Sequence, residues 1–420
     1  MLNIGNRLPG GSWTLKICPG PLEEKRIRFS AGDVPCVDVL LIYDRIIVSL
    51  QLDFNPKPLT LMAEITDPND EIVLSYAPHE IILFVNGEVR DEEWPAGKIA
   101  PCECVLCEME AELKEGATPR PVQPNVVSSF TGIWDWKPKG YNSFAGDCMP
   151  YVDGDTFHLF YLRDRRGHHS KWILGAHQWA HISSKDLVHW DEHPDAICIE
   201  DENEGSICTG SVIKFGNIYR AFFCIRMTDK SPAKVMWADS EDLIHFTRSK
   251  DSFLLKPPYE PVSARDPFAY YDEDEGLYHL LITTSIKRDD GFHGIISDFV
   301  SKDLTNWEDR TPLVEFESTT RNQPACPDFF EKDGLWYLSY RDPERVNRYF
   351  FSENKRGPWI APEDNFVLSR EYIVPKSAKF NGRIIFAAFK KDCAERYYGG
   401  TLCLFEAVPD GNGSLKFEKL

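Results

Sequence analysis

The sequence has no low-complexity tract and no apolar run approaching 18 residues, so we expect no membrane-spanning segment. Its first residues lack a charged segment followed by an apolar stretch, which predicts no signal peptide and a cytoplasmic protein. Positive charge is scarce, because 47 Lys and Arg stand against 66 Asp and Glu, a net charge of -19. This excess of negative charge argues against a nucleic-acid or anionic-membrane partner. It also favours a neutral sugar over a phosphorylated one as the substrate. The sequence carries no signal for an oligomeric state.

Disulfides are not expected either. Twelve cysteines are scattered through 420 residues, which predicts reduced and mostly buried thiols. Cys102, Cys104 and Cys107 could hold zinc, but no fourth ligand has a familiar spacing, and a helix-like acidic stretch follows at 108–115. We favour a reduced structural cluster. A histidine–zinc site is also unsupported, because its members would fall on different strands or loops: His168, His169, His177 and His181. No metal or organic cofactor is implied.

The first hundred residues alternate apolar and polar side chains with the period of half-buried strands. Five segments show this pattern: 37–44, 45–54, 59–67, 71–77 and 80–89. They predict a β-sandwich, and the phrases at 84–88 and 91–95 resemble lectin-like jelly rolls. We favour a sandwich that packs on its neighbour over one that binds sugar. Prolines at 119, 121 and 124 indicate a stiff linker, which divides the chain into domains 1–120 and 121–420.

A repeat occupies the rest of the chain. The phrase Ser-x-Asp-Leu-x-x-aromatic occurs at 184–190, 240–246 and 301–307, about every sixty residues. A glycine turn followed by an aromatic-rich strand also recurs, at Gly154, Gly216, Gly276, Gly334 and Gly382. Five copies of a unit with about four strands predict a five-bladed β-propeller. The expected fold is therefore all-β, with a lectin-like sandwich preceding the propeller.

Acidic residues occur near the start of three of these units. Asp147, Asp266 and Asp328 each lie shortly before a glycine turn. Propellers bring such positions together at their axis, and glycoside hydrolysis needs one carboxylate as nucleophile or base and another as acid. A third carboxylate can bind sugar hydroxyls and shift the pKa of the others. Asp-Pro and Pro-Asp are also turn dipeptides, but their recurrence in register with the units favours a site.

Several motifs resemble glycoside hydrolase family 32, the invertase, levanase and inulinase group, and more distantly family 43. Arg265-Asp266-Pro267 matches the RDP motif of the invertase group. The segment 175–190 is similar to that family's HWGHAVSKDLVHW stretch, and 208–212 is similar to its FSGSAV strand. Ala325-Cys326-Pro327-Asp328 stands where the family has Glu-Cys-Pro-Asp. The resemblance covers the propeller part of the chain, although family 32 usually carries its sandwich after the propeller.

The resemblance implies a β-fructofuranosidase that works by a retaining two-carboxylate mechanism. Asp147 falls where the nucleophile sits, although the family's Asn-Asp-Pro-Asn-Gly is replaced by Ala145-Gly146-Asp147-Cys148-Met149-Pro150. Asp266 falls where the transition-state stabiliser sits. We expect the substrate, an oligosaccharide or another fructoside, to be bound by aromatic, imidazole and charged side chains. The candidates are Arg265, His177, Trp179, His181 and Asp328.

Position 325 is Ala, where the family has its acid/base glutamate. An alanine cannot donate a proton, so general acid catalysis, worth about 10²–10⁴-fold, is expected to be lost. Either the chain carries a deliberate Glu→Ala change, or the natural protein is a binding or differently catalysing relative. Two alternatives therefore stand beside the disarmed fructosidase. One is an inverting, family-43-like arabinofuranosidase with Asp147 as base, and the other is a non-catalytic carbohydrate-binding propeller.

Overall fold

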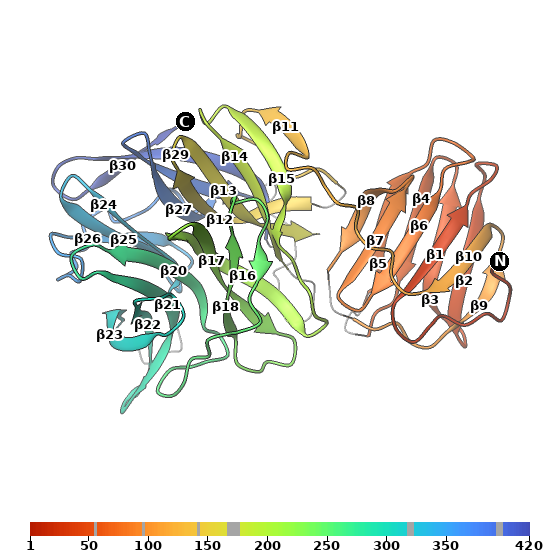
Figure 1. Ribbon diagram of the computed structural model, residues 1–420, viewed down its shortest axis with the longest axis horizontal. Coiled ribbons are helices and arrows are strands. Elements are labelled where there is room, and N and C mark those ends of the chain that lie inside the picture. Colours follow the sequence, from red (N-terminus) through yellow and green to blue (C-terminus); the bar gives the residue numbers. More distant parts are fainter. Residues whose placement is uncertain (54–56, 95–96, 141–142, 166–176, 317–322, 392–397) are drawn as a thin grey trace.

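The computed structural model describes residues 1–420 except 54–56, 95–96, 141–142, 166–176, 317–322 and 392–397 (Figure 1). Over the described residues every regular element is a β-strand, and the strands form seven antiparallel sheets. The expectation of an all-β protein is confirmed. In the same part of the chain, no helix has the length and apolar composition that a membrane span requires.

The N-terminal part of the chain forms two five-stranded sheets, at the right of Figure 1. One has the order β10 (Glu110–Glu115), β1 (Trp13–Cys18), β6 (Ile72–Ala77), β7 (Glu80–Val85), β8 (Glu88–Glu93). The other has the order β5 (Leu59–Glu64), β4 (Arg45–Leu50), β3 (Val34–Ile42), β2 (Lys25–Ala31), β9 (Glu103–Cys107). Because strand side chains alternate between faces, Leu15 of β1 and Val39 of β3 are buried in one core that both sheets share.

The stretch at 108–115, expected to be helix-like, is a strand over most of its length. Residues Glu110–Glu115 form β10, which pairs with β1 along its whole length. Ala111 and Leu113 face the shared core, whereas Glu112 between them and Glu110 and Lys114 on either side are exposed. The period is therefore two. The high content of Glu and Lys, which are good helix formers, misled the prediction.

Five further sheets follow. The first has the order β11 (Ser128–Thr131), β15 (His189–Ile197), β14 (Gln178–Ser184), β13 (Thr156–Arg165), β12 (Ser143–Asp153). The second is β16 (Glu204–Phe215), β17 (Ile218–Met227), β18 (Lys234–Ser240), β19 (Thr247–Arg248), and the third is β20 (Arg265–Asp272), β21 (Leu277–Arg288), β22 (Gly291–Ser301), β23 (Glu308–Glu315). The fourth is β24 (Ala325–Lys332), β25 (Leu335–Arg341), β26 (Asn347–Ser352), and the last is β27 (Tyr372–Phe380), β28 (Arg383–Lys390), β29 (Thr401–Pro409), β30 (Leu415–Lys419).

Both repeated sequence signals have a defined local structure. All five predicted turn glycines connect the first two strands of a sheet, and all have positive φ, between 58° and 81°. In the phrase at 184–190, Asp186 accepts hydrogen bonds from the backbone N–H groups of Val188 and His189, while Leu187 has a φ of 64°. The phrases at 240–246 and 301–307 repeat these bonds. Each polar turn thus fixes the chain after the third strand of its sheet.

The first strands of the five sheets, β12, β16, β20, β24 and β27, share one irregularity. In each, two consecutive residues of the first strand stand opposite a single residue of the second strand, which makes a β-bulge. The residue pairs at the bulges are Gly146-Asp147, Cys208-Thr209, Asp266-Pro267, Cys326-Pro327 and Val374-Pro375. Bulges re-aim side chains and are frequent next to functional sites. Each of these strands also lies beside the first strands of two other sheets.

Buried charges connect β8 to the first of these five sheets. Glu92 accepts a hydrogen bond from Arg163 of β13 at 2.7 Å and pairs with Arg120 at 2.5 Å. The guanidinium of Arg163 lies 4.6 Å from the ring centre of Trp94, which is fully buried in the same core as Leu162. Burial favours the neutral form of Glu92, but the two arginines outweigh it and hold the pKa of Glu92 below its ordinary range. The domain boundary near residue 120 stays a prediction.

We predict that Glu92→Gln lowers the free energy of unfolding by about 1.5–3 kcal/mol near pH 7, because it removes the buried carboxylate that Arg163 and Arg120 share and leaves them with Asp195 and Glu80 as partners. The folded-state pKa of Glu92 is lowered, so wild-type stability falls as the pH drops below the unfolded-state value of about 4.3. The variant lacks this part of the acid sensitivity. Urea unfolding at a series of pH values measures both effects. Glu88→Gln, an exposed carboxylate on the same strand, is the control; identical behaviour of the two variants would contradict the prediction.

Candidate active site

The structure brings five of the expected residues to one pocket of about 340 Å³. Asp147 of β12 and Asp266 and Arg265 of β20 line it, together with Ala325 of β24 and His177, which immediately precedes β14. The expected residues on β12, β20 and β24 lie at or beside the bulges of their strands, and β16 and β27 also line the pocket at their bulges. Sequence positions far apart converge because the bulged strands lie side by side.

The carboxylate of Asp147 is buried and hydrogen-bonded on both oxygens. Tyr398 donates its hydroxyl to Oδ1 at 2.6 Å, and Thr209 of β16 donates to Oδ2 at 2.7 Å. The backbone N–H of Asp147 in turn donates to the Tyr398 hydroxyl at 2.9 Å. Burial raises the pKa of Asp147, and the bonds from Tyr398 and Thr209 oppose that rise. This carboxylate is held in one orientation in an environment that keeps it basic.

Asp266 is held by its own bulge. Its φ is 55°, and its Oδ2 accepts a hydrogen bond from the backbone N–H of Cys326 at 2.9 Å. Arg265 Nε lies 3.4 Å from the same oxygen. The sulfur of Cys326 lies 3.4 Å from Asp266 Oδ2 and 3.7 Å from Asp147 Oδ2, so the two carboxylates flank one thiol. Burial raises the pKa of Cys326 well above its ordinary value, which keeps the thiol neutral between them.

Ala325 lines the same pocket directly opposite Arg341 in the β24–β25 ladder. Its methyl group can neither give nor take a proton. The other acidic residue among the described lining is Asp342. Its Oδ2 accepts a hydrogen bond from Arg348 at 2.6 Å, and its Oδ1 accepts one from the backbone N–H of Val346. Both carboxylate oxygens of Asp342 are thus engaged by neighbouring residues of the chain.

Residues 148–358 match the family model "Glycosyl hydrolases family 32 N-terminal domain", which covers just over half of the chain. The chain belongs to glycoside hydrolase family 32. The matched range contains Asp266 and Ala325 and begins one residue after Asp147.

Curated relatives and solved structures agree with this family. A sucrose-6-phosphate hydrolase of Escherichia coli is 26% identical over 210 residues, 48% of this chain and 42% of the relative. A β-fructofuranosidase of Arabidopsis thaliana, insoluble isoenzyme CWINV1, is 24% identical over 248 residues, 54% of this chain and 40% of the relative. The chain thus spans less than half the length of these relatives. Fructan 1-exohydrolase IIa from Cichorium intybus has a TM-score of 0.54 at 18% identity, covering 71% of this chain and 62% of that one.

Trp179, His181 and Asp328 were expected to bind substrate, but they are absent from the lining of this family 32 pocket. Trp179 is fully buried and donates its indole N–H to the Cys208 carbonyl, and His181 is stacked on Phe160. Both belong to β14, the third strand of its sheet, and no residue of β14 is among the described residues that line the pocket. Asp328 follows the bulge of β24 and accepts hydrogen bonds from the N–H and hydroxyl of Ser377. It joins two sheets instead.

Three residues that contact the carboxylates are not among the site residues predicted from the sequence: Thr209, Cys326 and Tyr398. Thr209 occupies the same bulge position on β16 as Asp147 does on β12, and alignment of the first strands could have found it. Tyr398 follows β28 and has no comparable signal. Its ring stacks on His177 with centroids 4.8 Å apart, and His177 Nε2 lies 2.8 Å from Asp164 Oδ1. His168 and His169 lie outside the described residues.

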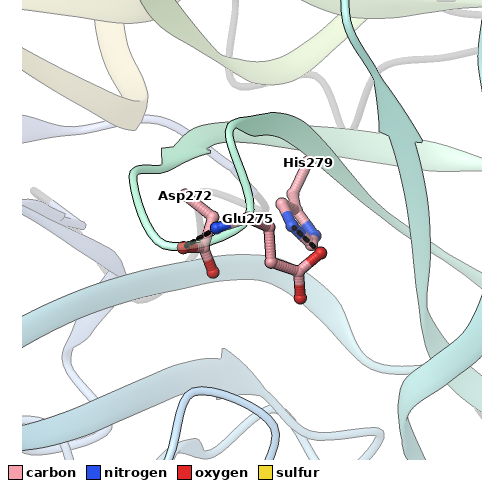
Figure 2. A group of neighbouring side chains, drawn as sticks. All are labelled: Asp272, Glu275 and His279. Carbon is pink, nitrogen blue, oxygen red and sulfur yellow. Dashed lines mark hydrogen bonds and ion pairs between the residues drawn. The ribbon is translucent and has the colours of Figure 1, made fainter.

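A separate group of metal-binding residue types lies at the turn after β20, at the other end of that strand from the pocket. Figure 2 shows Asp272, Glu275 and His279, with the Glu275 carboxylate directed toward the imidazole. Asp272 accepts a hydrogen bond from Lys355 at 2.6 Å, and Glu275 pairs with Arg310 at 2.7 Å. Each carboxylate therefore has a cationic partner, and we interpret the group as an ion-pair network that fixes this turn.

Burial raises the pKa of Asp328 to about 6, although Lys376 and Ser377 favour its charged form. The folded state therefore keeps this proton to a higher pH than the unfolded chain, whose Asp pKa is about 3.9. We predict that wild-type stability falls, relative to Asp328→Asn, by about 3 kcal/mol as the pH rises from about 4 to about 6. Urea unfolding across that range measures the difference. Asp333→Asn, an exposed site on the same hairpin, should show no such trend.

Proposed function

We propose that this pocket is a retaining hydrolase site for terminal β-fructofuranosides, impaired at its proton-donating step. Asp147 is the nucleophile, Asp266 binds ring hydroxyls and stabilises the transition state, and residue 325 is the position of the acid/base group. One observation carries the proposal: Asp147 and Asp266 come from different sheets, yet both lie within 3.7 Å of the Cys326 sulfur in one pocket. The names of the relatives, sucrose-6-phosphate hydrolase and β-fructofuranosidase, support a fructoside substrate.

The fold we propose for the five C-terminal sheets is a five-bladed β-propeller. Their first strands neighbour one another in the closed sequence β12, β16, β20, β24, β27 and back to β12, as the innermost strands of five blades would. The pocket then lies at the axis, where the bulges meet. The two N-terminal sheets form a lectin-like β-sandwich in this proposal, which their shared core supports.

In the proposed reaction a carboxylate oxygen of Asp147 attacks the anomeric carbon as the bond to the glycosidic oxygen breaks, and that oxygen leaves with a proton. Water then hydrolyses the fructosyl ester, which releases fructose and restores the carboxylate. Tyr398 and Thr209 orient the attacking carboxylate through their hydrogen bonds. The proton would come from a glutamate at 325, and Ala325 cannot supply it. Without an acid, departure of the alcohol is slower by about 10²–10⁴-fold. In this proposal the chain therefore binds its substrate but hydrolyses it slowly.

A non-catalytic carbohydrate-binding propeller is the second candidate. Ala325 favours it, because the pocket keeps two buried carboxylates for sugar hydroxyls but has an inert methyl group at the acid position. Activity separates the two candidates, since a binding module gains none when the acid is supplied.

We predict that Ala325→Glu gains about 10²–10⁴-fold in fructose release from sucrose and short fructans, because it supplies the missing proton donor. Release of fructose, assayed for the variant beside the unchanged chain, is the measurement. The double variants Ala325→Glu/Asp147→Asn and Ala325→Glu/Asp266→Asn should lose the gain.

Ala361→Glu, at an exposed position outside the pocket, is the matched control and should gain nothing. Release of arabinose from aryl arabinofuranosides, without release of fructose, would move the chain to an arabinofuranosidase. No turnover by Ala325→Glu, with sugar binding retained, would establish the binding module instead.

A further inference from the structure

The N-terminal sheets contact the sheet of Asp147 through buried charges on one strand. This strand is β8, at the side of the N-terminal sheets that faces the C-terminal ones (Figure 1). Arg165, the last residue of β13, donates a hydrogen bond to Asp91 of β8, and Arg163 donates one to Glu92. Both carboxylates are nearly fully buried. Charged side chains are seldom so buried unless they are paired, so this contact is a fixed part of the structure.

Asp91 joins three strands. Its Oδ2 accepts a hydrogen bond from the backbone N–H of Met62 in β5 at 2.9 Å, and its Oδ1 accepts the one from Arg165. Arg165 stands opposite Ser143 in the β12–β13 ladder, four residues before Asp147. The strand end that Asp91 holds is therefore paired with the residues of β12 that lead into the bulge of the nucleophile.

A chain of side-chain contacts leads from the same strand end to the pocket. Asp164 precedes Arg165, and its side chain points to the opposite face of β13 because strand side chains alternate. Asp164 Oδ1 lies 2.8 Å from His177 Nε2, and the His177 ring stacks on Tyr398 with centroids 4.8 Å apart. Tyr398 donates its hydroxyl to Asp147 at 2.6 Å. The position of the nucleophile thus depends on residues that the end of β13 carries.

Tyr398 fits its place because two neighbouring positions have no side chain. A Cβ atom at Gly146 would lie 2.6 Å from the Tyr398 ring, and one at Gly399 would lie 3.0 Å from Asp164 Oδ2. Real Cβ atoms seldom or never approach other atoms this closely, so the phenol packs tightly against β12 and its turn packs against Asp164. A displacement of Asp164 or of the start of β12 must therefore displace the phenol as well.

We propose that Asp91 of the N-terminal sheets is a positioning residue for the nucleophile Asp147. It acts through Arg165 and the contacts that lead from β13 to Tyr398. The inference rests on the proposed function in that Asp147 attacks the sugar. A misplacement of about 1 Å, even when its cause lies far from the reacting atoms, can slow a reaction about 100-fold. The N-terminal sheets are then part of the working site, rather than a separate sugar-binding module.

β-Fructofuranosyl fluoride allows a test in the chain with Ala325, because fluoride leaves without a proton. A carboxylate oxygen of Asp147 bonds to the anomeric carbon as the C–F bond breaks, and fluoride takes the bonding electron pair. The rate of fluoride release in the first turnover therefore measures the attack by Asp147. We expect Asp91→Asn to lower this rate by about 10-fold or more, with KM changed by less than about 3-fold.

The pH dependence of the same rate separates positioning from a general loss of structure. The hydrogen bond from Tyr398 opposes the rise that burial causes in the pKa of Asp147, so weakening this bond raises the pKa further. Attack needs the ionised carboxylate. The acid limb of the pH–rate profile should therefore move to higher pH in Asp91→Asn, by about one pH unit.

A double variant tests whether Asp91 acts through Tyr398. Once Tyr398→Phe has removed the hydroxyl, Asp91→Asn should change the rate by about 2-fold or less, because both changes act on one hydrogen bond. Additive effects of the two changes would overturn the route through Tyr398.

Asp70→Asn is the matched control. Asp70 is also a buried carboxylate of the N-terminal part, and it accepts hydrogen bonds from Thr66, Asp67 and Asn86. It should lower the temperature of unfolding but leave the rate and its pH profile unchanged. Equal rates and profiles for Asp70→Asn and Asp91→Asn would overturn the inference. Arg165→Lys, which keeps the charge but loses the guanidinium geometry, replaces Asp91→Asn if thermal unfolding shows that variant to be unfolded.

Crystal structures of the unchanged chain and of the variant give a readout that does not need turnover. We expect the Tyr398 hydroxyl to leave hydrogen-bond distance of Asp147 in the variant, and an unmoved hydroxyl contradicts the role of Asp91. Absence of fluoride release from the unchanged chain would remove the proposed function, and the position of Tyr398 would then decide on Asp91. Equal fluoride release by the unchanged chain and Asp91→Asn would remove this inference and keep the hydrolase.

Discussion

A single extra residue in the first strand of each C-terminal sheet is the constraint on which the site depends. A regular strand directs successive side chains to opposite faces, where they pack between sheets. The bulges interrupt that alternation. Asp266 and Cys326 take positive φ values of 55° and 52° there, and Pro267 and Pro327 follow them. Proline fits such a position, because it lacks the N–H that a continuous ladder would need. The backbone irregularity thereby presents polar side chains such as Asp147, Thr209 and Asp266 to the pocket.

The electrostatics of the pocket depend on contacts between sheets. Asp147 of β12 is held by Thr209 of β16 and by Tyr398, and Asp266 of β20 by the backbone of Cys326 in β24. Neither carboxylate is held by residues of its own sheet alone. Burial raises the pKa of Asp147 and of Cys326, and hydrogen bonds from other sheets oppose the rise. A change in the packing of one sheet would therefore alter the protonation of a group on another.

The sequence predicted what is local and recurrent. The glycine turns and the Ser-x-Asp-Leu phrases fixed the number and order of the repeated sheets, and Arg265-Asp266-Pro267 located one wall of the pocket. The sequence did not predict the roles that depend on which strand of a sheet carries a residue. Trp179 and His181 lie in a motif of the right family but on the third strand, away from the pocket. Tyr398 contacts a residue 251 positions earlier, and no local pattern records such a contact.

Ala325 occupies the position that the proposed mechanism assigns to the acid. Its methyl group stands directly opposite Arg341 in the β24–β25 ladder and lines the same pocket. The two neighbouring carboxylates, Asp147 and Asp266, nevertheless keep the hydrogen bonds that orient them. None of these bonds uses the side chain at 325, so the geometry of the carboxylate pair does not depend on which residue stands there. A change at 325 can therefore add or remove a proton donor without rebuilding the rest of the pocket.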